Sequence, residues 1–226
     1  MKKATLLLSI LLSGMLALSC SMASYEDLFP CEAAAFNVEK SKSATATYKI
    51  NADGIKYFRI DASTNAEIVN TDAVADLTVG KRVIVWYNEL KDPVSSDFFK
   101  VKILVGAALQ IEEGEVAAVQ SALEDYGSPV DIIQDPVSSI EDGFLTLRYR
   151  IIHSGNIKHG FRLIYNPESP TLVHFIHQSN GDIEGEVTDG IICFPLDFLP
   201  EGCESIEVEY KALSGATTSI VYRTGI

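Results

Sequence analysis

The chain has 226 residues, and its 18 Lys and Arg against 31 Asp and Glu give a formal net charge of −13. Such a surface repels phosphate backbones, because nonspecific affinity for nucleic acid comes from Lys and Arg that displace counterions. We therefore expect no nucleic-acid partner, and anionic lipid is disfavoured for the same reason.

Residues 1–19 have the order of a secretory signal. Lys2 and Lys3 give a positive start, an almost wholly apolar stretch follows, and the small Ser19 precedes Cys20. The apolar stretch is interrupted by Ser and Gly and is short for a membrane span, which needs about 20 mostly apolar residues. We therefore expect a cleaved signal peptide, with an uncleaved anchor as the alternative.

Cys20 stands at the expected cleavage point, and this arrangement resembles a bacterial lipoprotein signal. The resemblance implies that the thiol is acylated and that the mature chain is held on the cell envelope without a transmembrane helix. Ala17-Leu18 is unusual at this place, so a plain signal peptide is the alternative. Ser21, where Asp would indicate retention in the inner membrane, favours the outer membrane by the same resemblance.

Residues 20–35 show no strand periodicity and read as a tether between lipid and fold. From residue 36 the pattern is that of half-buried strands, in which apolar and polar residues alternate. A turn-rich break follows the second expected strand, at 61–65. We expect one β domain over 36–108, with strands at 44–50, 55–60, 81–89 and 99–105.

The second half of the chain predicts a second β domain over 109–226. Residues 115–126 give its only helical pattern, and Gly127-Ser128-Pro129 would end that helix. Several strands at roughly 10- to 15-residue spacing favour an antiparallel β-sandwich. We expect these strands at 145–151, 161–165, 172–178, 187–194, 206–210 and 218–223.

The chain from about residue 36 to its end resembles the NigD-like lipoprotein family. The resemblance implies an N-terminal OB-like barrel, a C-terminal β-sandwich and a lipid anchor, and it supplies no functional residues to carry over. It is carried by Ala52-Asp53-Gly54, Gly80 to Tyr87, Val101-Lys102-Ile103, Asp135-Pro136-Val137, Gly143 to Leu147, Lys158-His159-Gly160-Phe161 and the segment from His174 to Phe194 with Asn180-Gly181-Asp182.

Three cysteines remain if Cys20 is acylated. Cys193 and Cys203 flank a turn that contains Pro and Gly, so they could form a disulfide, which is permitted outside the cytoplasm. The alternative is that Cys31, Cys193 and Cys203 are buried thiols that pack as small hydrophobic groups. No cysteine spacing resembles a zinc site.

Four aromatic residues lie on expected barrel strands: Tyr57, Phe58, Trp86 and Tyr87. OB barrels bind oligosaccharides or oligonucleotides on one strand face, where bases and sugars stack on aromatic rings. The negative charge would allow a saccharide there and not a nucleic acid. The favoured alternative is that these rings fill the core of the small barrel.

The four histidines are candidate site residues, because imidazole is a common metal ligand and general base. His174 and His177 are three residues apart in an expected strand, and this odd offset places them on opposite faces. His153 and His159 flank a turn and could approach each other across it. No carboxylate is obviously placed to join them, so surface or strand packing is the favoured interpretation.

Asn180-Gly181-Asp182 opens a segment similar to a calcium loop, but Ile191 stands at the twelfth position, where the motif needs Glu. A solvated hairpin explains the segment equally well. The chain also lacks the Gly-x-Ser-x-Gly and glycine-rich phosphate motifs of hydrolases and nucleotide-binding proteins. We therefore predict no catalytic residue, no cofactor and no metal ligand.

These observations favour a non-enzymatic, lipid-anchored protein of the envelope that docks a protein or glycan partner. Two alternatives remain. One is self-protection against a secreted antibacterial protein, which only the family's name-giving bacteriocin-associated locus suggests. The other is a glycan-active enzyme, because paired carboxylates are placed by the fold and not by sequence spacing.

Overall fold

The computed structural model of the protein describes residues 41–90, 98–119 and 125–224. The described residues fold into strands and turns, with one short 3-10 helix, η3, at Thr71–Val74. This confirms the all-β prediction. No helix in the described ranges has the length and apolar character needed to cross a bilayer. The predicted signal peptide and tether, with Cys20 and Cys31, lie outside the described residues.

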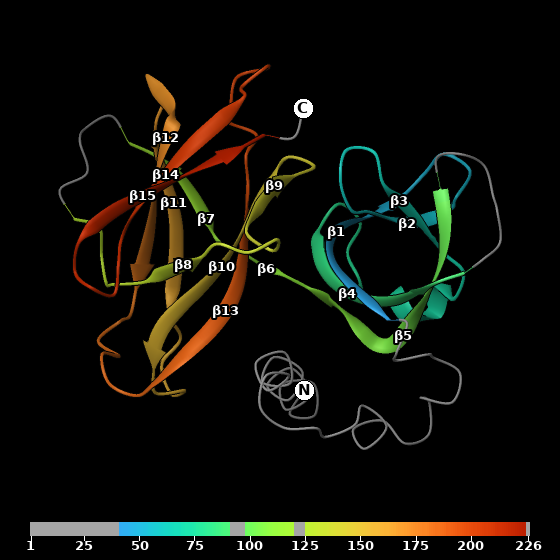
Figure 1. Ribbon diagram of the computed structural model, residues 1–226, viewed down its shortest axis with the longest axis horizontal. Coiled ribbons are helices and arrows are strands. Elements are labelled where there is room, and N and C mark those ends of the chain that lie inside the picture. Colours follow the sequence, from blue (N-terminus) through green and yellow to red (C-terminus); the bar gives the residue numbers. More distant parts are fainter. Residues whose placement is uncertain (1–40, 91–97, 120–124, 225–226) are drawn as a thin grey trace. The chain divides into compact units, whose positions relative to one another are not determined.

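The first part of the fold is a closed five-stranded barrel (Figure 1). Its strands follow the order β1-β2-β3-β5-β4, with β3 and β5 parallel and the other neighbours antiparallel. This order closes the sheet on itself and confirms the OB-like expectation. The strands are β1 Lys42–Ile50, β2 Lys56–Arg59, β3 Asn65–Ile68, β4 Arg82–Glu89 and β5 Phe98–Gln110.

The barrel core follows from the alternation along these strands. Tyr48, Phe58, Val83, Val85 and Tyr87 are buried in one apolar cluster, and the rings of Tyr48 and Phe58 lie 6.0 Å apart. The structure adds β3, Asn65–Ile68, directly after the turn predicted at 61–65, where the sequence predicted no strand. Only four residues long, β3 is fixed by pairing with β2 and β5.

The second part consists of two five-stranded sheets, and the whole is the predicted β-sandwich (Figure 1). Most neighbours are antiparallel, and three pairs, β6–β13, β7–β11 and β12–β14, are parallel. The first sheet has β6 Glu112–Glu113, β13 Glu186–Pro195, β10 Phe144–His153, β8 Asp131–Ile133 and β9 Ser139–Glu141. The second has β15 Thr217–Arg223, β14 Ser205–Lys211, β12 Ser169–Gln178, β11 Gly160–Asn166 and β7 Glu115–Ala118.

The sandwich core is built from the inward-facing residues of both sheets. Leu145 and Leu147 of β10, Phe175 of β12 and Phe194 of β13 are completely buried. The rings of Phe175 and Phe194 meet edge to face, 5.8 Å apart. Each Å² of apolar surface that is buried stabilises the fold by about 25 cal/mol, so such a cluster is the main stabilising element of the domain.

The helix predicted over 115–126 is wrong where the structure describes this segment. Residues Glu115–Ala118 form β7, which pairs in parallel with β11. Val116 packs against the sandwich core, while Glu115 forms an ion pair with Arg162 of β11 at 3.0 Å. Over four residues, the alternation of a strand cannot be distinguished in the sequence from one turn of a helix. The segment is a strand because it pairs at the edge of the second sheet.

Candidate functional site

Two connections at one end of the sandwich domain bring a group of polar residues together. Residues 154–159 lead from β10 in the first sheet to β11 in the second, and residues 179–185 lead from β12 back to β13. His153 and His159 stand at the two ends of the first connection. Asp182 lies in the second. His177 lies in β12, directly opposite Phe161 of β11.

His177 and His159 form a buried chain of hydrogen bonds. The Nδ1 atom of His177 lies 2.8 Å from the carbonyl oxygen of Pro129, and its Nε2 atom lies 2.8 Å from Nδ1 of His159. The backbone segment before Pro129 covers His177, since Ser128 N–H donates to the His177 carbonyl at 2.7 Å. Both imidazoles are thereby shielded, with exposed fractions of 2% for His177 and 8% for His159.

Asp182 ends this chain on the other side of His159. One of its carboxylate oxygens, Oδ2, lies 3.1 Å from His159 Nε2 and accepts hydrogen bonds from the backbone N–H and the hydroxyl of Ser154, both at 3.0 Å. A tight turn presents the carboxylate: Asn180 and Gly181 both have positive φ, and Asp182 N–H donates to the Ser179 carbonyl. Asn-Gly is the sequence that this turn favours.

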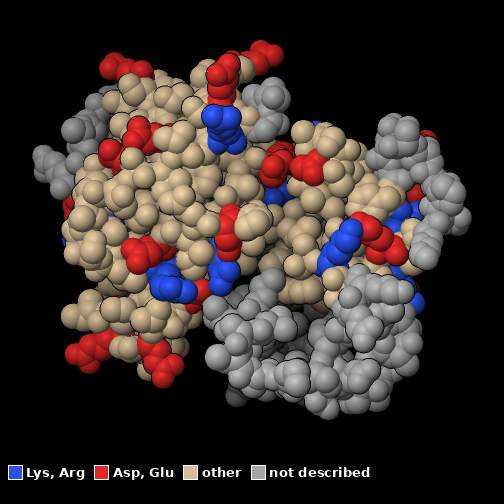
Figure 2. Space-filling view, viewed as in Figure 1, with Lys and Arg blue, Asp and Glu red and all other residues tan. Residues whose placement is uncertain are grey.

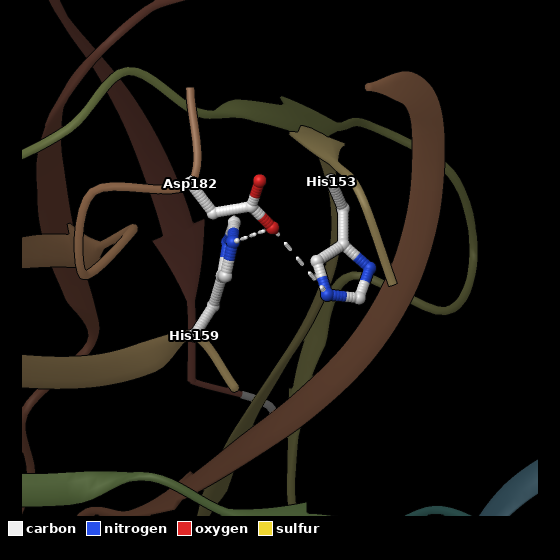
Figure 3. Close-up of side chains that lie close together, drawn as sticks. All are labelled: His153, His159 and Asp182. Carbon is white, nitrogen blue, oxygen red and sulfur yellow. Dashed lines mark hydrogen bonds and ion pairs between the residues drawn. The ribbon is translucent and has the colours of Figure 1, made fainter. Parts of the chain in front are cut away.

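His153 is the fourth titratable member and the most exposed one. Its Nε2 atom lies 3.9 Å from Asp182 Oδ2 and 3.0 Å from the carbonyl oxygen of Ile157. Figure 3 shows the carboxylate of Asp182 directed toward the rings of both His153 and His159. Glycine at position 185 allows the second connection to come close to the backbone of His153, because a Cβ atom there would lie 2.5 Å from the His153 carbonyl oxygen.

Hydrogen-bond chemistry assigns protons within this group. A carbonyl oxygen only accepts, so His177 Nδ1–H donates to Pro129. Burial lowers the pKa of His177 and favours its neutral form, so its Nε2 atom accepts the proton of His159 Nδ1. The Ser154 N–H bond lowers the pKa of Asp182, which is therefore a carboxylate. The 3.1 Å separation of His159 Nε2 and this carboxylate oxygen is that of a hydrogen bond.

The sequence predicted part of this arrangement. The rings of His153 and His159 do approach each other, with centroids 4.7 Å apart, and His174 and His177 do lie on opposite faces of β12. His174 forms an ion pair with Glu209 at 3.2 Å instead. The sequence missed the carboxylate, because Asp182 is 23 residues from His159, and it missed His177 as a partner.

The four aromatic residues considered as a ligand face do not form one exposed surface. Phe58 and Tyr87 are buried in the barrel core, which is the alternative placement that the sequence favoured. Tyr57 and Trp86 are half-buried on β2 and β4. Their role as ligand-binding rings stays a prediction.

Cys193 and Cys203 are free thiols, one buried and one half-buried, so the possible disulfide does not form and the alternative of packed thiols holds for these two residues. Cys193 is buried in β13 with its Sγ 3.6 Å from the Glu112 carbonyl oxygen, and Cys203 contacts the carbonyl of Ser205. The physical reason is that β13 directs Cys193 into the space beside β6, away from the turn that was expected to join the two residues. Burial raises the pKa of Cys193 to about 12, so the thiol is unreactive in the folded protein.

A second charged group lies on the β10–β13 pair, and it is fully paired. The carboxylate of Asp189 accepts hydrogen bonds from Arg148 and Arg150, and Arg148 also contacts Asp135 at 2.8 Å. Arg150 and Asp189 are direct cross-strand neighbours. With each charge matched to an opposite one on the sheet, this group acts as a structural network.

Comparisons with solved structures support the fold. A protein from Parabacteroides distasonis described as toxin-related has a TM-score of 0.61 and 22% identity, with 81% of this chain and 94% of that chain covered. A Bacteroides vulgatus protein of unknown function has a TM-score of 0.66 and 18% identity over 82% and 92% of the two chains. A NigD-like immunity protein from Bacteroides caccae has a TM-score of 0.55 and 16% identity over 80% and 96%.

These identities are low enough that the likeness shows the fold alone. A search of curated proteins found no match. The family described as NigD-like C-terminal beta sandwich domain matches residues 115–223, which contain every member of the His153–His159–His177–Asp182 group. This match confirms the resemblance of the second half of the chain to the NigD-like family.

Proposed function

We propose that this protein is a non-enzymatic binding protein, lipid-anchored at Cys20 on the cell envelope, whose sandwich domain docks a protein partner. The observation that carries the docking proposal is a set of exposed aliphatic side chains around the His153–Asp182 end of that domain. We call this set the aliphatic rim, and it consists of Ile152, Ile157, Ile183 and Val187.

All four residues of the rim lie at this end of the domain, either on its strands or in its connecting loops. Ile152 and Val187 are direct cross-strand partners on β10 and β13. Ile157 lies in the first crossover connection and Ile183 directly follows Asp182 in the second. Ile183 is 74% exposed and Val187 is 62% exposed. Exposed aliphatic groups that gather at one place on a soluble domain mark an interaction site.

The chemistry of the rim favours a protein over a membrane or a glycan. Glu184 and Glu186 are exposed beside Ile183 and Val187, and they repel anionic lipid. At this end of the domain, at the lower left of Figure 2, uncharged surface lies between acidic groups. The rim has no aromatic ring on which a sugar could stack. The partner it fits is a protein surface that combines aliphatic and basic side chains.

Site-specific photocrosslinking in intact cells tests the docking proposal. A photoreactive amino acid at position 183 is expected to give one adduct of discrete mass, and a second substitution, Val187→Asp, should remove it. The matched control is position 221 on β15, where Val221 is 63% exposed but lies away from the rim. Adducts that are identical from both positions, or none from position 183, would contradict the proposal.

The anchor has its own test, because it rests on the sequence before Cys20 and not on the rim. Cys20→Ser should release the protein from the membrane fraction and abolish its labelling by radioactive fatty acid. Membrane association with acyl labelling in this variant would refute lipidation at this residue. Docking at the rim and anchoring at Cys20 can therefore fail separately.

Self-protection against a secreted antibacterial protein is the second candidate function. A Bacteroides caccae structure with the same fold is described as a NigD-like immunity protein, and for this function the docked partner would be the secreted antibacterial protein. Deletion of the gene should then sensitise cells to one neighbouring strain in a growth competition. Val221→Asp should restore protection and Ile183→Asp should not. Unchanged competition after deletion excludes this function and leaves the docking proposal to the crosslinking experiment.

A further inference from the structure

We propose that His153, His159 and Asp182 bind one divalent transition-metal ion, with Zn²⁺ as the best fit, and that His177 orients His159 from behind. The ligand atoms of these three residues lie within 4.8 Å of one another. Around a tetrahedral ion with bonds of about 2.0–2.1 Å, ligand atoms are about 3.4 Å apart. The distances from Asp182 Oδ2 to His159 Nε2, 3.1 Å, and to His153 Nε2, 3.9 Å, lie on either side of this value.

The hydrogen bonds behind His159 prepare it as a ligand. His159 Nδ1–H donates to His177 Nε2, and His177 Nδ1–H donates to the Pro129 carbonyl. With Nδ1 of His159 as the donor to His177, the other ring nitrogen, Nε2, faces Asp182 and is the one available to an ion. Metal-ligating histidines in proteins have the same pattern, in which the other ring nitrogen donates to a fixed acceptor and sets the ring orientation.

Asp182 is held in an equally defined position. Two hydrogen bonds from Ser154 fix its Oδ2 atom beside both imidazoles, and its other oxygen, Oδ1, has no hydrogen bond of its own in the described residues. A carboxylate held in this way approaches an ion without a large loss of side-chain entropy. Its negative charge also offsets part of the charge of a divalent ion, and the acidic surface adds to this attraction.

The donor set selects the class of metal. Ca²⁺ and Mg²⁺ prefer oxygen ligands, whereas two imidazoles and one carboxylate suit Zn²⁺. To bind the ion, His153 must release its 3.0 Å hydrogen bond to Ile157 and carry its proton on Nδ1. Three protein ligands leave the fourth position of a tetrahedral ion open.

Titration of the purified chain with Zn²⁺ after chelator treatment tests this site. Calorimetry should show one ion bound per chain in the wild type. His159→Gln and Asp182→Asn should each weaken binding by about 100-fold or more, and His177→Phe by about 10- to 100-fold. The matched control is His174→Gln, because His174 also pairs with a carboxylate, that of Glu209, on the other face of β12. It should bind as the wild type does.

Co²⁺ gives a readout that needs no variant. Bound to His153, His159 and Asp182 it should show visible d–d absorption without the near-ultraviolet charge-transfer band of a Co²⁺–thiolate bond, which separates this site from any cysteine site. Circular dichroism confirms that each variant is folded. No saturable binding of Zn²⁺ by the wild type, a thiolate band, or equal affinities of His159→Gln, Asp182→Asn and the wild type would overturn the proposal.

Discussion

The barrel and the sandwich bury polar groups in different ways. In the barrel, the most deeply buried charge is Arg82 of β4, whose Nη1 donates to Thr47 of β1 at 3.3 Å. In the sandwich, His177, His159 and Asp182 are buried together, and each contacts the next along one line of hydrogen bonds. All four histidines of the chain belong to the sandwich and none to the barrel.

This difference places the linked imidazoles and carboxylate in one part of the molecule, the sandwich. Burial of a polar group without a partner costs about 1–3 kcal/mol, so a chain of three buried titratable residues is stable only if donors and acceptors alternate along it. In the sandwich, the Pro129 carbonyl, His177, His159 and Asp182 are joined in this way by contacts of 2.8, 2.8 and 3.1 Å. The barrel offers no comparable group in its described residues.

The largest expected effect comes from the sandwich core. Phe175→Ala removes a completely buried ring that contacts Phe194 and Phe161, and it should lower the free energy of unfolding by about 3–5 kcal/mol. Urea denaturation followed by circular dichroism measures this change. The matched variant in the barrel is Phe58→Ala, which should cost a similar amount and be reported by Trp86, the single tryptophan of the chain. A loss below about 1 kcal/mol for either variant would contradict the core assignment.

His177→Phe should have a smaller effect that is specific to the polar chain. The ring fits the site by shape, since His177 already stacks on Phe161 at 5.2 Å, but the His159 Nδ1–H and the Pro129 carbonyl lose their partner. We expect a loss of about 1–3 kcal/mol in the same urea experiment. A variant as stable as the wild type would mean that the hydrogen-bond chain does not form.

The same variant should also change the response to pH. Because burial lowers the pKa of His177 below 6.5, the unfolded chain takes up a proton on this residue at a higher pH than the folded chain does. Stability therefore falls as the pH drops through 6.5 toward the folded pKa. Comparing urea midpoints at about pH 8 and about pH 5 should show a smaller decrease for His177→Phe than for the wild type. Equal decreases would assign the pH dependence to other groups.

The sequence predicted the fold better than the site for a physical reason. Strand periodicity is local, so β10, with Leu145 and Leu147 alternating against Arg148 and Arg150, was visible without any tertiary information. Short elements such as β3 and β7 are fixed by their neighbours in the sheet, and the sequence predicted no strand at either place. Periodicity carries no information about which sheet a strand enters. The sequence therefore could not predict which strands pair in parallel.

The site depends on that missing information. His153 and His159 are close along the chain, and their approach was predicted from the turn between them. Asp182 joins them only because β10 and β11 lie in different sheets, which makes both connections cross the same end of the sandwich. The Asn180-Gly181-Asp182 turn was recognised as a loop with ligand-like residues. Its imidazole neighbours could be found only from the three-dimensional structure.

The smallest expected effect concerns the two thiols of the sandwich. Cys193 and Cys203 have separate carbonyl partners, so the domain gains nothing from a covalent link, and reducing agent should leave its urea midpoint unchanged. Alkylation without reductant should modify Cys193 only after denaturation, because burial raises its pKa to about 12, and mass spectrometry should then find both residues labelled. The barrel serves as an internal reference, since β1 to β5 contain no cysteine and Trp86 fluorescence should not respond to reductant. A midpoint that falls on reduction, with Cys193 and Cys203 unlabelled beforehand, would show that the sandwich relies on a disulfide where the barrel relies on packing alone.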